Sequence, residues 1–91
     1  MSTIEMNNIY QISDGVKSRK ESFGLLIVSK TTPAMSLNHD AKAVWDLIDG
    51  VNTVSEIVTI LAQQYESNDI QDNVIEILNG FLQINLITQK Q

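Results

Sequence analysis

The stretch that decides the fold is LNHDAKAVWDLIDG, residues 37–50. Asn38 has a side chain that can accept a hydrogen bond from the backbone N–H groups of the next turn, so a helix is predicted to begin there. Gly50 can adopt the left-handed conformation that ends a helix. Apolar side chains recur between them at the spacing of one helix face, at Ala41, Val44, Trp45 and Ile48. We expect Trp45 to lie at the centre of the core.

A second helix is predicted to begin at Thr53. Glu56 follows three residues later, and this pair is typical of a capping box, in which each side chain bonds the backbone N–H of the other residue. The apolar stripe of this helix consists of Val54, Ile57, Val58, Leu61 and Tyr65. Its spacing predicts a helix that ends near Tyr65, and the polar residues 66–68 then indicate a loop.

The third helix is predicted between Asp69, as its N-terminal cap, and Asn85. Asparagine tolerates the left-handed conformation better than most residues, so Asn85 is predicted to stop the helix. The apolar positions of this helix are Ile70, Val74, Ile77, Leu78, Phe81 and Leu82. Like the other two helices, it has one apolar face to bury.

Three strands are predicted upstream of the helices. They cover Val16–Arg19, the apolar and β-branched Phe23–Val28, and Ala34–Leu37. Three strands followed by three amphipathic helices predict an α+β, winged-helix-like domain, in which a three-stranded antiparallel sheet precedes a three-helix bundle. We expect residues 1–9 to be a flexible arm and residues 10–91 to be one domain, with short extended pieces at 10–12 and 86–88.

The amino-acid composition limits the classes of function that this chain can have. The chain has 91 residues, of which 43% are hydrophobic and 19% charged, as expected for one globular domain. It has no cysteine, which excludes disulfides and thiolate metal sites. Without a long apolar run or a secretory signal, the sequence predicts a cytoplasmic protein that is not bound to membrane.

The charges divide the chain into two halves. Residues 1–36 carry four basic and three acidic side chains, whereas residues 37–91 carry two basic and eight acidic ones. The acidic half would repel a phosphate backbone, so we expect no binding to nucleic acid.

No catalytic constellation is visible. His39 is the only histidine, and Asp40, Asp46 and Asp49 fall on or near the polar face of a helix, so a solvated surface is the simpler interpretation of all four. No serine has a His–Asp partner system, and the glycines are too dispersed for a phosphate loop. We therefore expect no enzyme activity, no metal and no cofactor.

The order of these anchors resembles the PqqD family. The matching positions are Leu37-Asn38, Ala41, Val44-Trp45, Leu47-Ile48, Asp49-Gly50, Thr53-Val54, Ile57, Leu61, Tyr65, Asn73-Val74, Ile77-Leu78, Phe81 and Asn85-Leu86-Ile87. Upstream, residues 19–24 resemble the strand entry of free-standing members. Two positions depart from the pattern: Asn73 replaces an acid and Asn85 replaces a glycine, and both changes are conservative for capping.

The resemblance implies a function. PqqD-like domains are recognition elements (RREs) for ribosomally synthesised and post-translationally modified peptides (RiPPs), and they bind a precursor's leader as an extra strand. By this resemblance the leader would lie along Ala34, Met35, Ser36 and Leu37, and the facing wall would be Asn73, Ile77, Gly80 and Phe81. Met35 suits an adaptable pocket lining. Gly80 could serve close approach by a peptide or a close helix–helix contact. The acidic Asp69, Asp72 and Glu76 could favour leaders that carry Lys or Arg.

The implied protein is a non-catalytic peptide chaperone in natural-product biosynthesis. Its partners would be a precursor leader and a peptide-modifying enzyme, a radical S-adenosylmethionine (SAM) enzyme, and it would be a monomer or a weak homodimer. The alternative is a winged-helix-type adaptor or DNA-associated regulator that binds another protein. A phosphopantetheine carrier is disfavoured because no Asp-Ser-Leu triplet occurs. The sequence leaves the peptide, its modification and the pathway open, pyrroloquinoline quinone biosynthesis included.

Overall fold

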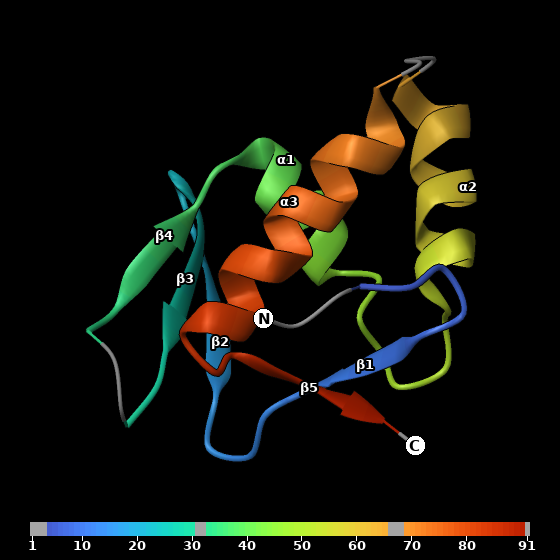
Figure 1. Cartoon of the computed structure of the whole chain (residues 1–91). Coiled ribbons are helices and arrows are strands. Elements are labelled where there is room, and N and C mark those ends of the chain that lie inside the picture. The colour runs from blue at the N-terminus through green and yellow to red at the C-terminus, as the bar shows by residue number, and fades with distance from the viewer. Residues whose placement is uncertain (1–3, 31–32, 66–68, 91) are drawn as a thin grey trace.

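The structure is a computed structural model that describes residues 4–30, 33–65 and 69–90 (Figure 1). The predicted loop at 66–68 lies outside these residues. Among the described residues, no helix is long and apolar enough to cross a membrane. In chain order the elements are β1 (Ile9–Ile12), β2 (Lys17–Glu21), β3 (Gly24–Val28), β4 (Met35–Leu37), α1 (His39–Trp45), α2 (Val54–Tyr65), α3 (Ile70–Gln83) and β5 (Ile87–Lys90).

Strands β2, β3 and β4 form the predicted antiparallel sheet, in that order. The three helices follow it in sequence and pack on one of its faces (Figure 1), so the predicted fold class is confirmed. Each of the three predicted strands began one residue too early, and the first also ended two residues too soon. The main consequence is at Phe23, which does not open the central strand but lies in the turn between β2 and β3, where its side chain is 64% exposed.

Helix α1 is shorter than its apolar stripe suggests. It ends at Trp45, and the chain then tightens, with the Leu47 N–H bonded to the Val44 carbonyl and the Ile48 N–H bonded to the Trp45 carbonyl, both at 3.1 Å. Ile48 is nevertheless buried, as predicted. Gly50 adopts a positive φ of 78°, but in the loop beyond the helix rather than at its end.

The start of α2 confirms the capping box. The Thr53 N–H donates to Glu56 Oε1 at 2.9 Å, and the Glu56 N–H donates to Thr53 Oγ1 at 3.1 Å. Two further N–H groups of the first turn donate to the carbonyls of Met6 and Asn8, at 2.8 and 2.9 Å. Residues 4–8 of the expected flexible arm therefore contact the domain and satisfy helix donors that would otherwise lack partners.

Helix α3 ends at Gln83, and Asn85 is the left-handed residue just beyond it, where the sequence predicted the stop. Asn85 has φ of 61°, its N–H bonds the Leu82 carbonyl at 3.1 Å, and the Leu86 N–H bonds the Phe81 carbonyl at 3.0 Å. This is the Schellman pattern, with asparagine in place of the usual glycine. At the other end Asp69 occupies the cap position, but its side chain makes no capping hydrogen bond.

The two short extended pieces pair with each other. β1 and β5 form a second, two-stranded antiparallel sheet that the sequence did not predict as a pair. The loop after α1 is attached to it: the Gly50 N–H donates to the Tyr10 carbonyl at 3.0 Å, and Lys90 Nζ donates to the Gly50 carbonyl at 2.9 Å. Both ends of the domain are thereby tied to its middle.

The core confirms the predicted place of Trp45. This side chain is 6% exposed and meets Phe81 edge to face, with ring centroids 5.3 Å apart. The core joins one face of each helix to the inner face of the sheet. Its buried members are Tyr10, Leu25, Ile27, Leu37, Val44, Trp45, Ile48, Val54, Ile57, Leu61, Val74, Leu78, Phe81, Leu86 and Ile87.

Candidate functional site

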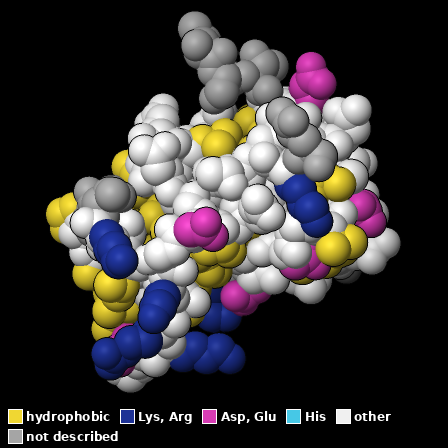
Figure 2. Space-filling view, turned by 90° about the horizontal axis from the view of Figure 1, so that it is seen from below, with side chains coloured by type: hydrophobic (Ala, Val, Ile, Leu, Met, Phe, Trp, Pro, Cys, Tyr) yellow, Lys and Arg dark blue, Asp and Glu magenta, His cyan; other side chains and the backbone are white. Residues whose placement is uncertain are grey.

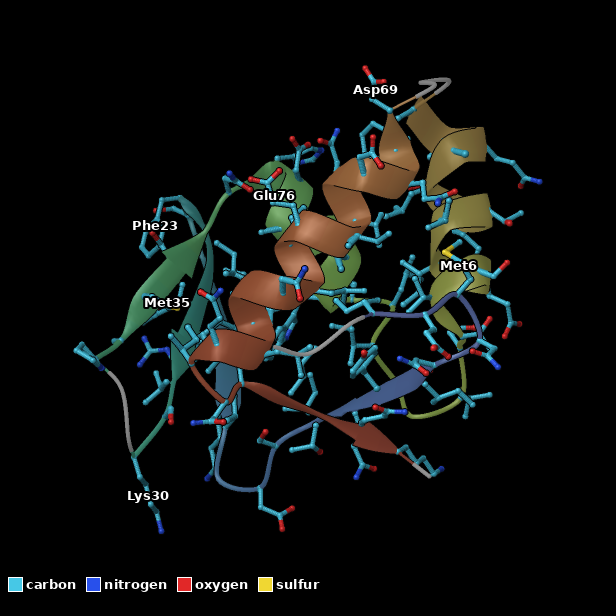
Figure 3. All side chains as sticks on the ribbon, viewed as in Figure 1. Met6, Phe23, Lys30, Met35, Asp69 and Glu76 are labelled. Atoms are coloured by element: carbon cyan, nitrogen blue, oxygen red, sulfur yellow. The ribbon has the colours of Figure 1, made fainter. Side chains whose placement is uncertain are left out.

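A groove lies between β4 and α3. We call it the β4–α3 groove, and it has two adjoining parts. The apolar part has a volume of about 280 Å³ and is lined by Met35, Ser36, Leu37, Asn38, Ala41, Ile77, Gly80, Phe81 and Ile84. The acidic part, about 350 Å³, is lined by Asn38, Asp40, Ala41, Asn73, Glu76 and Ile77. Because three residues line both parts, the groove is continuous (Figure 3, where Met35 and Glu76 are labelled).

The free edge of β4 presents the backbone groups of Ser36. β2 and β3 are joined by a two-residue loop, so their last pair, Glu21 and Gly24, exchanges both backbone hydrogen bonds. Backbone groups alternate in direction along a strand, so Leu25 turns its N–H and C=O towards β4, where it pairs with Leu37. Ser36 therefore turns its N–H and C=O away from β3, to an edge where the structure describes no neighbouring strand.

The position of the Leu37 carbonyl supports this assignment. A Cβ atom built on Gly24 would lie 3.2 Å from the Leu37 oxygen, so this oxygen points at β3. Gly24 also has φ of 139°, which L side chains rarely adopt. Glycine is therefore required where the ends of β3 and β4 come together.

Side chains alternate along β4 in the same way. Leu37 is buried in the core, Met35 is half-buried against it, and Ser36 between them is exposed. On the opposite wall, Phe81 is 4% exposed and Ile77 is half-buried. The groove therefore has an apolar floor continuous with the core, and a hydrogen-bonding strand along one side.

Gly80 opens the groove rather than closing a helix contact. A Cβ atom built on Gly80 would meet no atom within 4 Å among the neighbours that the structure describes. Of the two explanations that the sequence left open, the structure therefore disfavours close helix packing. Because glycine has no side chain, the groove is open on its α3 side at this point.

Most residues that the resemblance indicated come together here. Met35, Ser36, Leu37, Ile77, Gly80 and Phe81 line the apolar part, and Asn73 lines the acidic part. Ala34 lies exposed before β4 and lines neither part. Sequence reasoning missed Asp40 and Ile84 as lining residues; it treated Asn38 and Ala41 only as parts of a helix. A buried helix face and a groove wall have the same apolar spacing, so no sequence signal distinguished them.

The groove is negatively charged. Asp40 and Glu76 are its charged lining residues, and no Lys or Arg lines either part. Of the acids that the sequence singled out, Glu76 lines the groove, whereas Asp72 lies on the outer side of α3. No group of three or more His, Asp or Glu side chains in the described ranges is placed to hold a metal ion. His39 lies outside the groove, with its ring 6.4 Å from that of Tyr65.

Three solved structures share this fold. The PqqD truncation of Methylobacterium extorquens PqqCD, a stand-alone RRE, has 26% identity and a TM-score of 0.79, over 94% of this chain and 95% of its own. TbiB1 in complex with the TbiA(beta) leader peptide has 19% identity and a TM-score of 0.76, over 85% and 93%. A lasso peptide synthetase B1 complexed with its leader peptide has 10% identity and a TM-score of 0.78, over 87% and 96%.

The fold is therefore that of the RiPP recognition elements. Residues 24–87 match the sequence profile of the family described as "Coenzyme PQQ synthesis protein D (PqqD)", so the chain belongs to the PqqD family, as its sequence indicated. No curated protein matches the sequence.

The open surroundings of Gly80 generate a prediction on stability. Glycine inside a helix costs about 1 kcal/mol relative to alanine. Because a Cβ atom at this position meets no neighbour, Gly80→Ala should raise the free energy of unfolding by about that amount, measured by urea denaturation. A variant that is less stable than the wild type would show that the α3 backbone is packed more closely here than described.

Proposed function

We propose that this protein is a non-catalytic recognition domain that binds the leader of a ribosomally synthesised precursor peptide and presents it to a modifying enzyme. The observation that carries the proposal is the unpaired edge of Ser36 beside an open groove. Two of the solved structures with this fold are complexes with leader peptides, and the chain belongs to the family of the third.

Binding would occur by strand addition. A peptide laid along β4 can donate to the Ser36 carbonyl and accept from the Ser36 N–H, which gives affinity without sequence information. Alternate side chains of that peptide would then point into the groove, where Met35, Ile77 and Phe81 offer an apolar surface. Specificity would come from these side chains.

The charge of the groove favours one kind of leader. A Lys or Arg side chain over the acidic part can pair with Asp40 or Glu76, for which no basic partner lines the groove. An acidic residue at the same place would be repelled. We therefore expect a leader that combines apolar anchors with a basic residue towards the first turns of α3.

The domain would increase the rate of the enzyme's modification reaction by proximity. A domain that holds the leader and also contacts the modifying enzyme raises the effective concentration of the core peptide at that enzyme's active site. We propose a radical SAM enzyme as this partner, residues 10–91 as the recognition domain, and the cytoplasm, where precursor peptides are synthesised, as the place of action. The domain would act as a monomer, since a second copy paired along β4 would occupy the leader's edge.

Calorimetric titration tests the proposal. The purified protein is titrated with the precursor encoded beside its gene, and with the leader and core halves separately. We expect a Kd near or below micromolar for the leader half, no binding of the core half, and weaker leader binding at higher salt because Asp40 and Glu76 contribute charge. Absence of binding to either half by a folded protein would count against leader recognition and favour an adaptor with another partner.

Ser36→Pro tests strand addition. Proline removes the outward N–H of Ser36 but none that bonds β3, so the sheet should persist. One lost hydrogen bond is worth about 1 kcal/mol, so leader affinity should fall about fivefold or more in the same titration. Ser36→Ala keeps the N–H and serves as the matched control. Equal affinities of the proline and alanine variants, with native circular dichroism, would contradict binding along this edge.

Gly80→Leu tests the opposite wall. A leucine side chain would fill the space above the glycine, and crowding of this kind costs about 1–3 kcal/mol, so leader affinity should fall about tenfold. Asn79→Leu adds a similar side chain at a position that lines the outer side of α3 rather than the groove. Its affinity should match the wild type. Loss of binding in both variants would point to a general effect on α3.

A further inference from the structure

Phe23 is placed where folding does not require it. The two-residue turn between β2 and β3 consists of Ser22 and Phe23, and such turns favour glycine, asparagine, aspartate or serine. The Phe23 side chain is 64% exposed at the tip of the hairpin (Figure 3). A large exposed aromatic residue at a turn suits contact with another molecule.

The hairpin tip forms one wall of a second hollow, which we call the hairpin hollow. Its volume is about 610 Å³, and α1 and α2 form its other walls. Tyr65 of α2, 39% exposed, lies across from the hairpin, and Leu61 of α2 lies in the lining with only 3% of its surface exposed. The hollow thus combines two accessible aromatic side chains with an apolar base.

The charged side chains that line the hairpin hollow are two lysines and two carboxylates, of which one lysine is left without an ion-pair partner among the described residues. The two carboxylates already have partners, Glu21 with Arg19 at 2.8 Å and Asp46 with Lys42 at 2.9 Å. Lys20 also lines the hollow and makes no ion pair with any residue that the structure describes. Figure 2, which shows the molecule from below and so from the end away from the hairpin tip, has Lys and Arg side chains mainly on the side where the three-stranded sheet lies.

The hairpin hollow and the β4–α3 groove have different lining residues. A cavity of about 290 Å³ lies between them, and it shares Ala43, Leu61 and Tyr65 with the hollow and Asp40, Asn73 and Ile77 with the groove. The hollow and the groove share no lining residue, and α1 lies between them, with His39 and Lys42 on the hollow and Asp40 and Ala41 on the groove. They also differ in charge, since no basic residue lines the groove. A peptide in the groove and a partner on the hollow would therefore contact different residues, with the cavity beside Tyr65 between them.

We propose that the hairpin hollow docks an acidic surface segment of the peptide-modifying enzyme, with Phe23 as the apolar anchor and Lys20 as the charge that orients it. This inference rests on the proposed function and adds the place of the enzyme. Charge complementarity distinguishes the two occupants, because the groove has only acidic side chains to offer a basic peptide, whereas the one unpaired charge in the lining of the hollow is the Lys20 ammonium. Aromatic side chains at the centre of an interface contribute most of its affinity, and charges at the rim mainly steer association.

The test uses two variants and a matched control. Asparagine is favoured in turns, so Phe23→Asn should keep the hairpin, and Lys20→Glu reverses the unpaired charge. Val51→Asn is the control, because Val51 is 68% exposed but lines neither surface. Calorimetry measures binding to the modifying enzyme encoded beside the gene, and separately to the leader half.

Both hairpin variants should bind the enzyme about tenfold more weakly or worse, which is the loss typical of an interface anchor, and their leader affinity should stay within about twofold of the wild type. Val51→Asn should change neither affinity. Higher salt should weaken enzyme binding by the wild type more than by Lys20→Glu.

Several outcomes would overturn the inference. Wild-type affinity of both folded variants for the enzyme would exclude the hairpin hollow as its docking site. A parallel loss of leader affinity would show that the hollow belongs to the leader site. A dimer that disappears in Phe23→Asn, detected by sedimentation, would make a second copy the occupant. None of these bears on leader binding by the wild-type protein, so a failure here is distinguishable from a failure of the proposed function.

Discussion

The groove depends on the edge-to-face contact between Trp45 and Phe81. Trp45 is the last residue of α1 and Phe81 lies near the end of α3, and their ring centroids are 5.3 Å apart. Such pairs contribute about 1 kcal/mol beyond the area they bury. Because α1 follows β4 after a single residue, the contact that seats α1 on α3 also sets the separation of β4 from α3. Phe81 is therefore a core residue on one side and the floor of the groove on the other.

The open edge of strand β4 would favour unwanted association in a protein that did not use this edge for binding. An unpaired edge without inward charge or internal proline can pair with other chains, and many sheets protect such edges. Here β4 has only three residues, its exposed edge offers the backbone groups of Ser36 alone, and the acidic residues along the groove repel a second acidic chain. These features limit pairing between identical copies and leave the edge open to a basic, extended peptide.

In the fold, the basic and acidic side chains of the sequence lie mainly in different parts of the molecule. Five of the six basic residues belong to β2, to the connection between β3 and β4 or to α1: Lys17, Arg19, Lys20, Lys30 and Lys42. The sixth, Lys90, donates to the Gly50 carbonyl, where it ties β5 to the loop after α1. The acids next to the groove are thus left without basic neighbours. The groove is thus lined by acidic side chains alone among its charged residues, whereas the hairpin hollow is lined by charges of both signs.

Features that depend on contacts within one turn of the chain are predicted correctly by the sequence. The Thr53–Glu56 capping box and the left-handed Asn85 depend on backbone groups three to five residues away, so the sequence pattern alone predicts them. The apolar stripes were likewise sufficient for the order of strands and helices. Phe23 was misplaced because an aromatic residue in a turn has the same composition signal as one in a strand.

What the sequence determined by itself was the order of elements, the buried face of each helix and the family, since these follow from spacing along the chain. The end of α1 at Trp45, the pairing of β1 with β5 and the open space at Gly80 were decided only by the tertiary structure. Each depends on what a distant segment does: the loop after α1 must reach the carbonyl of Tyr10, and α3 must stand off from β4. The groove is a space between elements, and its width depends on how those elements pack. No residue type in the sequence therefore indicates it.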